Sequence, residues 1–167
     1  KALIEVGGRS MVQRVVDAVG GAQAVHGVVV VGADEAWGLV CAKPLCLPPA
    51  GDDIVDNVTH GVRQVLAAEP ATERVIVVAA DVPLLRPEHV DWFAGHIAEE
   101  PADIHYGVVA KRVMEARFPS SRRSYVPLRG GTYCGADVHA STVAALFGHE
   151  ATWRALLERR KSAARQA

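Results

Sequence analysis

The hydrophobic positions along the chain follow two spacings, one typical of helices and one typical of buried strands. Apolar residues recur on one helical stripe over residues 10–19, 53–67 and 87–98, which predicts three amphipathic helices. Continuous apolar runs, rich in β-branched residues, lie between them at residues 28–31 and 75–80. Such runs are typical of strands that are buried on both faces of a parallel sheet. The pattern predicts an α/β domain in which both runs are central, parallel strands of one sheet, with helices covering its two faces.

The ends of the predicted helices carry their own signals. Ser10 suits the N-cap of the first helix, and Asp52 or Asp53 suits that of the second, because their side-chain oxygens accept hydrogen bonds from free N–H groups. We expect Gly20 and Gly21 to close the first helix in the left-handed conformation, which glycine adopts without a Cβ penalty.

The second half of the chain is less regular. Alternating apolar positions at residues 104–108 indicate a strand, and residues 124–128 and 132–139 suit two strands separated by two glycines. A basic helix is predicted over residues 151–165. No repeat, low-complexity linker or domain boundary interrupts the pattern, so we expect residues 1–167 to form a single domain.

Composition narrows the function classes. The 167 residues are 50% hydrophobic, with 18 Lys and Arg against 19 Asp and Glu. A near-neutral chain argues against a dedicated nucleic-acid binder, which needs a basic surface. The apolar runs are too short to span a bilayer, so no membrane partner is expected. The three cysteines (Cys41, Cys46 and Cys134) contain no C-x-x-C pair, which favours a reducing, cytoplasmic location.

Candidate chemistry lies just after the predicted buried strands, where open α/β sheets bind their ligands. Asp81 directly follows the apolar run at 75–80 and either holds a hard cation or caps its own turn. Asp137 follows a glycine-rich stretch that either admits a ligand or softens a hairpin. Asp56 and Asn57 lie in the first turn of the second helix, where free N–H groups attract anions, although ordinary helix-start chemistry explains them equally well.

Four segments, taken in order, resemble the nucleotidyltransferases related to molybdenum-cofactor guanylyltransferase. Residues 1–11 (KALIEVGGRSM) resemble the family segment K-x-L-x-x-V-x-G-[KR]-P-M-[IL]. Residues 75–85 (VIVVAADVPLL) are similar to its strand ending in D-x-P-L-[LV], and residues 51–61 to its helix start near the nucleotide. Residues 123–137 resemble its strand pair R-x-Y-V-x-L-x-x-G-T-[FY]-x-G-[GA]-[ND]. The ordered set covers most of the chain.

The resemblance implies a fold, a reaction and a set of site residues. The fold is a three-layer, Rossmann-like (GT-A-type) one with a mostly parallel central sheet. The reaction is Mg²⁺-dependent transfer of a nucleoside monophosphate from a nucleoside triphosphate, GTP or CTP, to a small phosphorylated or cofactor-type acceptor. Lys1 would neutralise the phosphates, Asp81 would bind Mg²⁺, and Asp137 would complete the metal site or touch the acceptor. The nucleotide would also lie near Gly51, Asp56, Asn57 and Ala80.

The chain departs from the family pattern in three places. The family's glycine-rich loop, L-A-G-G-x-[GS]-x-R, precedes its lysine, and this chain begins after that loop. We therefore expect the gene product to continue upstream through a short strand and this loop. Ser10 replaces a common proline, and Asp137 replaces a frequent asparagine and adds a negative charge.

Two other functions stay open. One is a catalytically silent nucleotide-binding or scaffold domain with the same fold. The other is a GT-A glycosyltransferase, which we rank last because Asp81-Val82-Pro83 lacks the second acid of the D-x-D sequence typical of that group. The identity of the nucleotide and the acceptor, and the oligomeric state, are not encoded in any pattern that we find.

Overall fold

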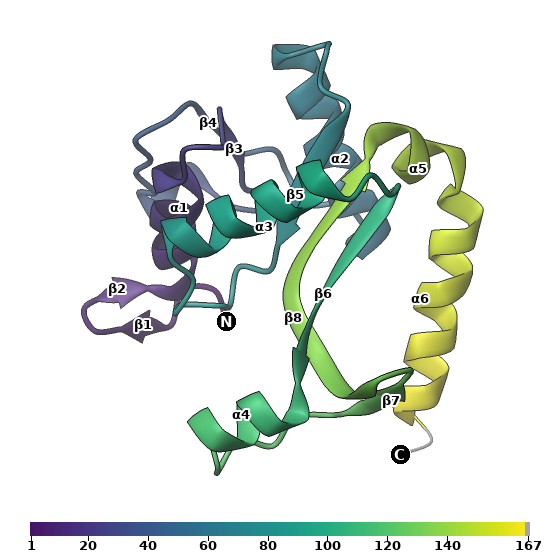
Figure 1. Ribbon diagram of the computed structural model, residues 1–167. Helices are drawn as coiled ribbons and strands as arrows, with labels where there is room; N and C mark the ends of the chain where they lie inside the picture. The colour runs from purple at the N-terminus through teal and green to yellow at the C-terminus, as the bar shows by residue number, and fades with distance from the viewer. Residues whose placement is uncertain (166–167) are drawn as a thin grey trace.

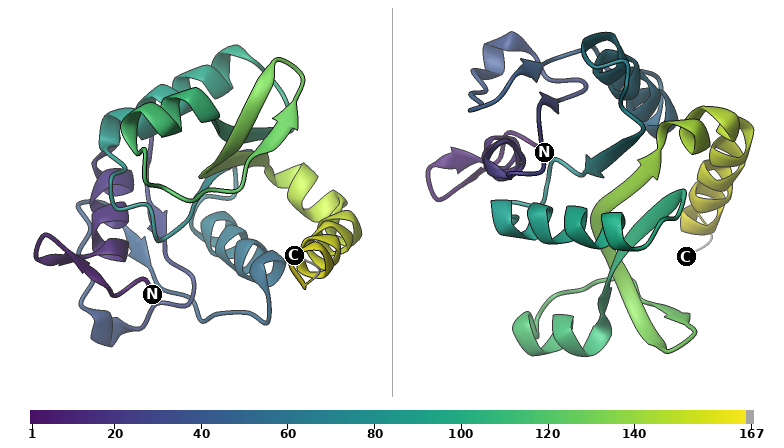
Figure 2. Two further views of the ribbon diagram at one scale, coloured as in Figure 1. Left: turned by 90° about the horizontal axis from the view of Figure 1, so that it is seen from below. Right: turned by 45° about the horizontal axis from the view of Figure 1, so that its top comes forward.

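The computed structural model describes the backbone of residues 1–165 and the side chains of residues 1–159. Helices cover both faces of a set of strands, with α3 (Pro87–Glu99) across one face and α2 (Ile54–Ala68) on the other (Figures 1 and 2). The predicted α/β class is confirmed. The helices at 10–19, 53–67 and 87–98 are confirmed as α1 (Met11–Gly21), α2 and α3.

The remaining helices and strands follow one another along the chain, and most of them are labelled in Figure 1. They are β1 (Glu5–Val6), β2 (Arg9–Ser10), β3 (Val28–Val29), the 3₁₀ turn η1 (Glu35–Trp37), β4 (Leu45–Cys46), β5 (Arg74–Val78), β6 (Ile104–Ala110), α4 (Lys111–Arg117), β7 (Val126–Leu128), β8 (Gly131–Thr142), α5 (Val143–Gly148) and α6 (Glu150–Arg165).

The strand pairing differs from the expected single parallel sheet. β3 pairs in parallel with β4 in a two-stranded sheet, and the ladder is continued by Val30 N donating to Cys46 O (2.9 Å). β5 instead pairs antiparallel with β8, which also pairs with β6 and β7. The expectation that both apolar runs are parallel strands of one sheet is therefore wrong. The run at 75–80 is also only half-buried, and the partner of a strand and its direction are set by distant segments.

The double glycine of α1 has a different role from the one expected. Both residues are helical, and the helix ends at Ala22, whose N–H donates to Val19 O (3.2 Å). A Cβ on Gly20 would lie 2.5 Å from Cys41 Sγ, and one on Gly21 would lie 2.9 Å from Pro87 Cγ. These glycines allow close packing of α1 against its neighbours, and neither of them adopts the left-handed conformation.

The largest fully buried side chains belong to α1 and α3, which pack against one another. Val12 and Val16 of α1 and Val90 of α3 are almost completely buried, with exposed fractions of 1%, 2% and 0%. Burying a valine side chain contributes about 1.5–3 kcal/mol. This packing fixes both helix starts relative to one another, and the functional candidates Lys1 and Asp81 lie close to those starts.

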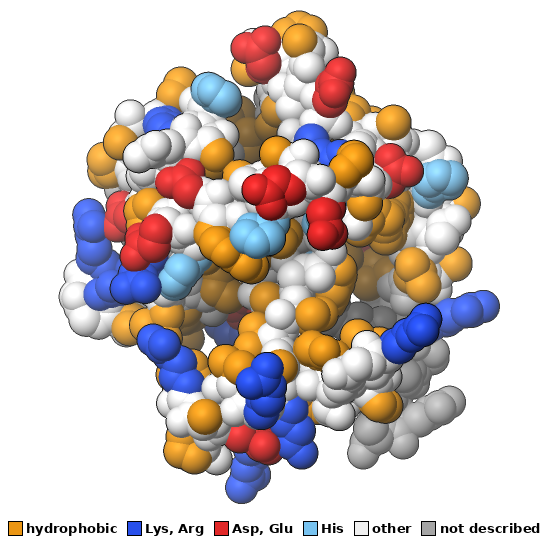
Figure 3. All heavy atoms as spheres, viewed as in Figure 1, with side chains coloured by type: hydrophobic (Ala, Val, Ile, Leu, Met, Phe, Trp, Pro, Cys, Tyr) orange, Lys and Arg blue, Asp and Glu red, His pale blue; other side chains and the backbone are white. Residues whose placement is uncertain are grey.

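β8, at 12 residues, connects the body of the molecule with an arm. Its second half pairs with β5, whereas its first half continues with β7, the end of β6 and α4 into an arm that extends from the body (Figure 1). The arm carries exposed basic side chains, and acidic ones gather over α3 (Figure 3). The basic ones include Lys111, Arg112, Arg117, Arg122 and Arg129. Within the described residues, no helix has the length and apolar character needed to cross a membrane.

Candidate active site

Lys1 and Asp81 meet at the carboxyl end of β5. Lys1 Nζ donates to Asp81 Oδ2 (2.5 Å), across 80 positions of sequence. The two side chains are 74% and 35% exposed. They are therefore paired with one another and still accessible to a ligand.

The start of α1 holds the Lys1 segment in place. Two N–H groups of its first turn bind the segment, Met11 N to Ile4 O (2.9 Å) and Val12 N to Ala2 O (3.0 Å). Ser10, as predicted, is the N-cap, and its Oγ accepts from Gln13 N (3.3 Å). The donors that every helix start leaves free are used here to anchor the segment that carries the lysine.

The backbone of Asp137 joins the same region. Its carbonyl oxygen accepts from Ala79 N (3.0 Å), one residue past the end of β5 and two residues before Asp81. The predicted site residue Ala80 lies between them. The fold thus brings together the Lys1 segment, the loop after β5 and the middle of β8.

Asp137 lies in an irregular part of β8. The register with β6 shifts between Tyr106 and Val108, and Asp137 has a φ of 61°. Such bulges re-aim side chains, and aspartate and asparagine tolerate the left-handed conformation better than most residues do. The positive φ at this position therefore favours aspartate or asparagine over most other residues.

Arg123 holds the Asp137 side chain. Its Nη2 donates to Asp137 Oδ2 (3.1 Å) and to Gly135 O (2.6 Å), and the hydrogen bond to Asp137 raises the pKa of the guanidinium. His139 stacks on Tyr106, with ring centroids 4.2 Å apart, and burial lowers the pKa of its imidazole. At neutral pH this imidazole is therefore uncharged, and the charges around Asp137 come from Arg123.

Substitutions at Asp137 are expected to separate backbone strain from charge. Asp137→Asn keeps the left-handed preference and an oxygen acceptor for Arg123, so we expect nearly unchanged stability. Asp137→Ala should be less stable than Asp137→Gly by about 1 kcal/mol, because only alanine places a Cβ in the strained region. Urea unfolding measures this difference. An alanine variant as stable as the glycine variant would contradict the strain at this position.

The predicted nucleotide residues Gly51, Asp56 and Asn57 form one compact junction at the start of α2. Asn57 Oδ1 accepts from Gly51 N (2.7 Å), and a Cβ on Gly51 would lie 2.5 Å from Asp56 Cβ. The N-cap is Asp53, whose Oδ1 accepts from Val55 N (2.8 Å) and Asp56 N (2.9 Å). These donors are therefore not free for an anion, and that part of the expectation is wrong.

The Asp56 carboxylate is also occupied. Arg154 Nη2 donates to Asp56 Oδ1 (2.7 Å), and this hydrogen bond lowers the pKa of Asp56. Sequence reasoning assigned no role to Arg154 or to Arg123. Arg154 pairs with Asp56 across 98 positions, a spacing that carries no sequence signal. Arg123 pairs with Asp137 across 14, and these two residues are the first and last of the segment that resembles the family strand pair, which is the signal that could have found Arg123.

The carboxylate oxygens of Asp81 and Asp137 are the type of ligand that a hard cation prefers. Asp81 and Asp137 each use Oδ2 in an ion pair, and within the described residues Oδ1 of each accepts no hydrogen bond. No group of three or more His, Cys, Asp or Glu side chains able to hold a metal occurs in that part of the chain. Mg²⁺ fits a site of one or two carboxylates, because it completes its shell with phosphate oxygens and water.

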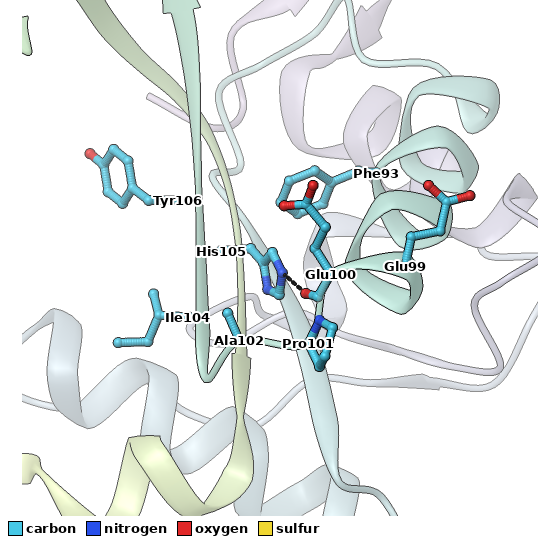
Figure 4. Close-up of a pocket in the computed structure, with 8 residues that line it drawn as sticks. All are labelled: Phe93, Glu99, Glu100, Pro101, Ala102, Ile104, His105 and Tyr106. Atoms are coloured by element: carbon cyan, nitrogen blue, oxygen red, sulfur yellow. Dashed lines mark hydrogen bonds between the residues drawn. The ribbon is translucent and has the colours of Figure 1, made fainter. Parts of the chain in front are cut away.

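Two surface pockets within the described residues lie elsewhere. One of about 460 Å³ is lined by Arg112, Val113, Ala116 and Arg117 of α4. The other, of about 630 Å³, lies where α3 leads into β6 (Figure 4) and is lined by Phe93, Glu99, Glu100, Pro101, Ala102, Ile104, His105 and Tyr106. His105 there is already bonded through both ring nitrogens, to Arg74 (3.2 Å) and to Glu100 O (2.7 Å). The Lys1–Asp81 ion pair lies in the loop after β5, whose Ala79 N–H bonds the backbone of Asp137, so we take this region as the candidate active site.

Three solved structures are similar to this chain in fold. A hypothetical transferase from Thermus thermophilus has a TM-score of 0.71 and 31% identity, over 99% of this chain and 64% of its own. A 4-diphosphocytidyl-2C-methyl-D-erythritol synthase from Anaerococcus prevotii has a TM-score of 0.68 and 14% identity, over 92% and 71%. A CMP:2-keto-3-deoxy-manno-octonic acid synthetase, solved with CTP, has a TM-score of 0.65 and 17% identity, over 98% and 79%.

These similarities show that the fold is Rossmann-like. The sequence matches the MobA-like NTP transferase domain over residues 1–165, and the chain belongs to that family. It spans 64% of the length of the Thermus transferase. No curated protein sequence matches it significantly.

Proposed function

We propose that this domain carries out Mg²⁺-dependent transfer of a nucleoside monophosphate from GTP or CTP to a small phosphorylated or cofactor-type acceptor in the cytoplasm. An acceptor oxygen attacks the α-phosphorus, the bond to the bridging oxygen breaks, and pyrophosphate leaves. Such transfers depend on in-line positioning and on charge neutralisation, and they need no covalent intermediate.

The observation that carries the proposal is the Lys1–Asp81 pair beside the backbone of Asp137. An ammonium group has three N–H donors. Asp81 accepts one of them and orients Lys1, which leaves two donors for phosphate oxygens. Since Lys1 is 74% exposed, a triphosphate reaches it without displacing any packed side chain.

Asp81 and Asp137 are the residues that would hold Mg²⁺. When bound, the ion would neutralise charge that develops on the phosphate oxygens. Arg123 donates to Asp137 Oδ2 (3.1 Å) and orients that carboxylate. Its other oxygen, Oδ1, accepts no hydrogen bond within the described residues, so that oxygen is the one that would bind the cation.

The nucleotide choice rests on two supports. The family resemblance suggests GTP, and one structure of the same fold was solved with CTP. The acceptor is proposed to be anionic because the arm next to the strand ends exposes several basic side chains, among them Arg122 and Arg129. A phosphorylated acceptor would complement this charge.

The direct test uses the full-length protein with each of the four common nucleoside triphosphates and a panel of phosphorylated acceptors. We expect pyrophosphate release that requires Mg²⁺, is abolished by EDTA and is restored by added Mg²⁺. We also expect nucleotide with Mg²⁺ to raise the melting temperature, because ligand binding stabilises the native state. If nucleotide raises the melting temperature but no pyrophosphate is released, the catalytically silent nucleotide-binding domain is favoured. If the protein hydrolyses sugar nucleotides and releases no pyrophosphate from nucleoside triphosphates, a glycosyltransferase is favoured.

A further inference from the structure

Arg154 joins helix α6 to the start of α2 through an ionic cluster. Its Nη1 donates to Asp53 Oδ2 (3.0 Å), and its Nη2 donates to Asp56 Oδ1 (2.7 Å) and Glu150 Oε1 (2.8 Å). The two helices lie side by side (Figure 2). A planar guanidinium presents five N–H donors in a fixed fork, which suits this three-carboxylate arrangement. We call these four residues the Arg154 cluster.

The cluster is more than an isolated surface ion pair. The side chains of Asp53 and Asp56 are only 24% and 23% exposed, so water screens them less than it screens a fully exposed pair. Hydrogen bonding to Asp56 and then to Glu150 raises the pKa of Arg154, so the guanidinium stays charged. Three carboxylates share this cation, and its removal would leave them facing one another without a counter-charge.

The cluster is connected to the Gly51 loop by direct contacts. Asp53 uses both carboxylate oxygens, Oδ1 to cap the N–H groups of Val55 and Asp56 and Oδ2 to bind Arg154. Gly51 packs directly on Asp56, where a Cβ would come within 2.5 Å, and its N–H is held by Asn57 Oδ1. The first turn of α2 therefore lies between Arg154 and the loop.

We propose that Arg154 is a positioning residue for the nucleotide. It fixes the first turn of α2, and through that turn it fixes Gly51 and Asn57, in the arrangement that receives the nucleotide. The inference rests on the proposed function, in which Gly51 and Asn57 lie near the nucleotide. Helix α6 thereby governs nucleotide affinity although Arg154 acts only through other residues.

The kinetic test compares Arg154→Ala and Arg154→Lys in the full-length protein, with Arg63→Ala as the matched control, because Arg63 is an exposed arginine of α2 that lies outside the cluster and the arm and contacts the Phe147 ring. Arg154→Ala should raise the KM for the nucleoside triphosphate about tenfold and leave kcat nearly unchanged. Arg154→Lys should recover part of the affinity, because an ammonium supplies charge without the planar fork. A variant that only loses folded protein would lower kcat and leave KM unchanged, and that result would overturn the proposal.

Amide hydrogen exchange tests the positioning itself and needs no nucleotide. In Arg154→Ala we expect faster exchange at Gly51, Val55 and Asp56 than in the wild type, with unchanged exchange in α3. If the wild-type protein binds no nucleotide, the proposed function fails, yet the exchange rates still decide whether Arg154 orders this loop. Unchanged exchange at these three amides overturns the inference whatever the kinetics show.

Discussion

Replacing Asp81 by alanine is expected to slow pyrophosphate release by about a hundredfold or more, since a metal and its charge stabilisation contribute several kcal/mol. The carboxylate orients Lys1 and is the proposed Mg²⁺ ligand closest in sequence to β5. Asp81→Asn should be almost as inactive, because an amide oxygen still accepts from Lys1 but no longer supplies a negative charge. The measurement is pyrophosphate production with saturating nucleotide, acceptor and Mg²⁺.

Two controls distinguish a loss of catalysis from the loss of an ion pair and from unfolding. Glu115→Gln removes another partly exposed acid from an ion pair, that with Lys111 on α4, and should leave turnover unchanged. The melting temperature of Asp81→Ala should stay close to that of the wild type, because exposed ion pairs contribute little to stability. Full activity in Asp81→Ala would eliminate the mechanism proposed for this site.

Gly107→Ala is expected to destabilise the fold by about 3 kcal/mol, because the new methyl group has no room. Its Cβ would lie 2.4 Å from the backbone oxygen of Val138, opposite the irregular segment of β8. That atom belongs to a paired strand and cannot move alone. A loss of this size lowers the melting temperature by about 6–12 °C for a domain of this length.

The matched control for Gly107 is Gly95, inside helix α3. A Cβ there meets nothing within 4 Å, so Gly95→Ala should stabilise the protein by about 0.5–1 kcal/mol through helix propensity. Thermal unfolding of both variants gives opposite shifts if the strand packing is as described. A neutral Gly107→Ala would show that β6 and β8 move apart at this position.

Local signals in the sequence predicted the helices accurately. Ser10 and Asp53 cap α1 and α2 as expected, because a cap and an apolar stripe are decided within a few neighbouring residues. The partners of the strands were not predictable in this way. The pairing of Val78 with Val138 joins segments far apart in the chain, and neither segment encodes its partner.

For the candidate site too, some residues could be predicted from the sequence and others could not. Resemblance to the family selected Lys1, Asp81 and Asp137, and the fold brings their backbone segments together. The arginines that neutralise the acids, Arg123 and Arg154, carried no assigned role. A charged side chain on a loop or a helix face resembles any solvated residue until its partner is known. Long-range ion pairs are thus the part of the site that pattern analysis misses.

β8 has a mechanical consequence for the arm. The strand runs without a break from the core pairing with β5 into the arm, and its irregular segment contains Asp137. Bulged strands bend more readily than regular ones, because a local stretch of the ladder is disrupted. If the arm tilts, we therefore expect the backbone to bend at the irregular segment of β8, which contains Asp137. We therefore expect a molecule that binds the arm to change the orientation of the Asp137 carboxylate as well.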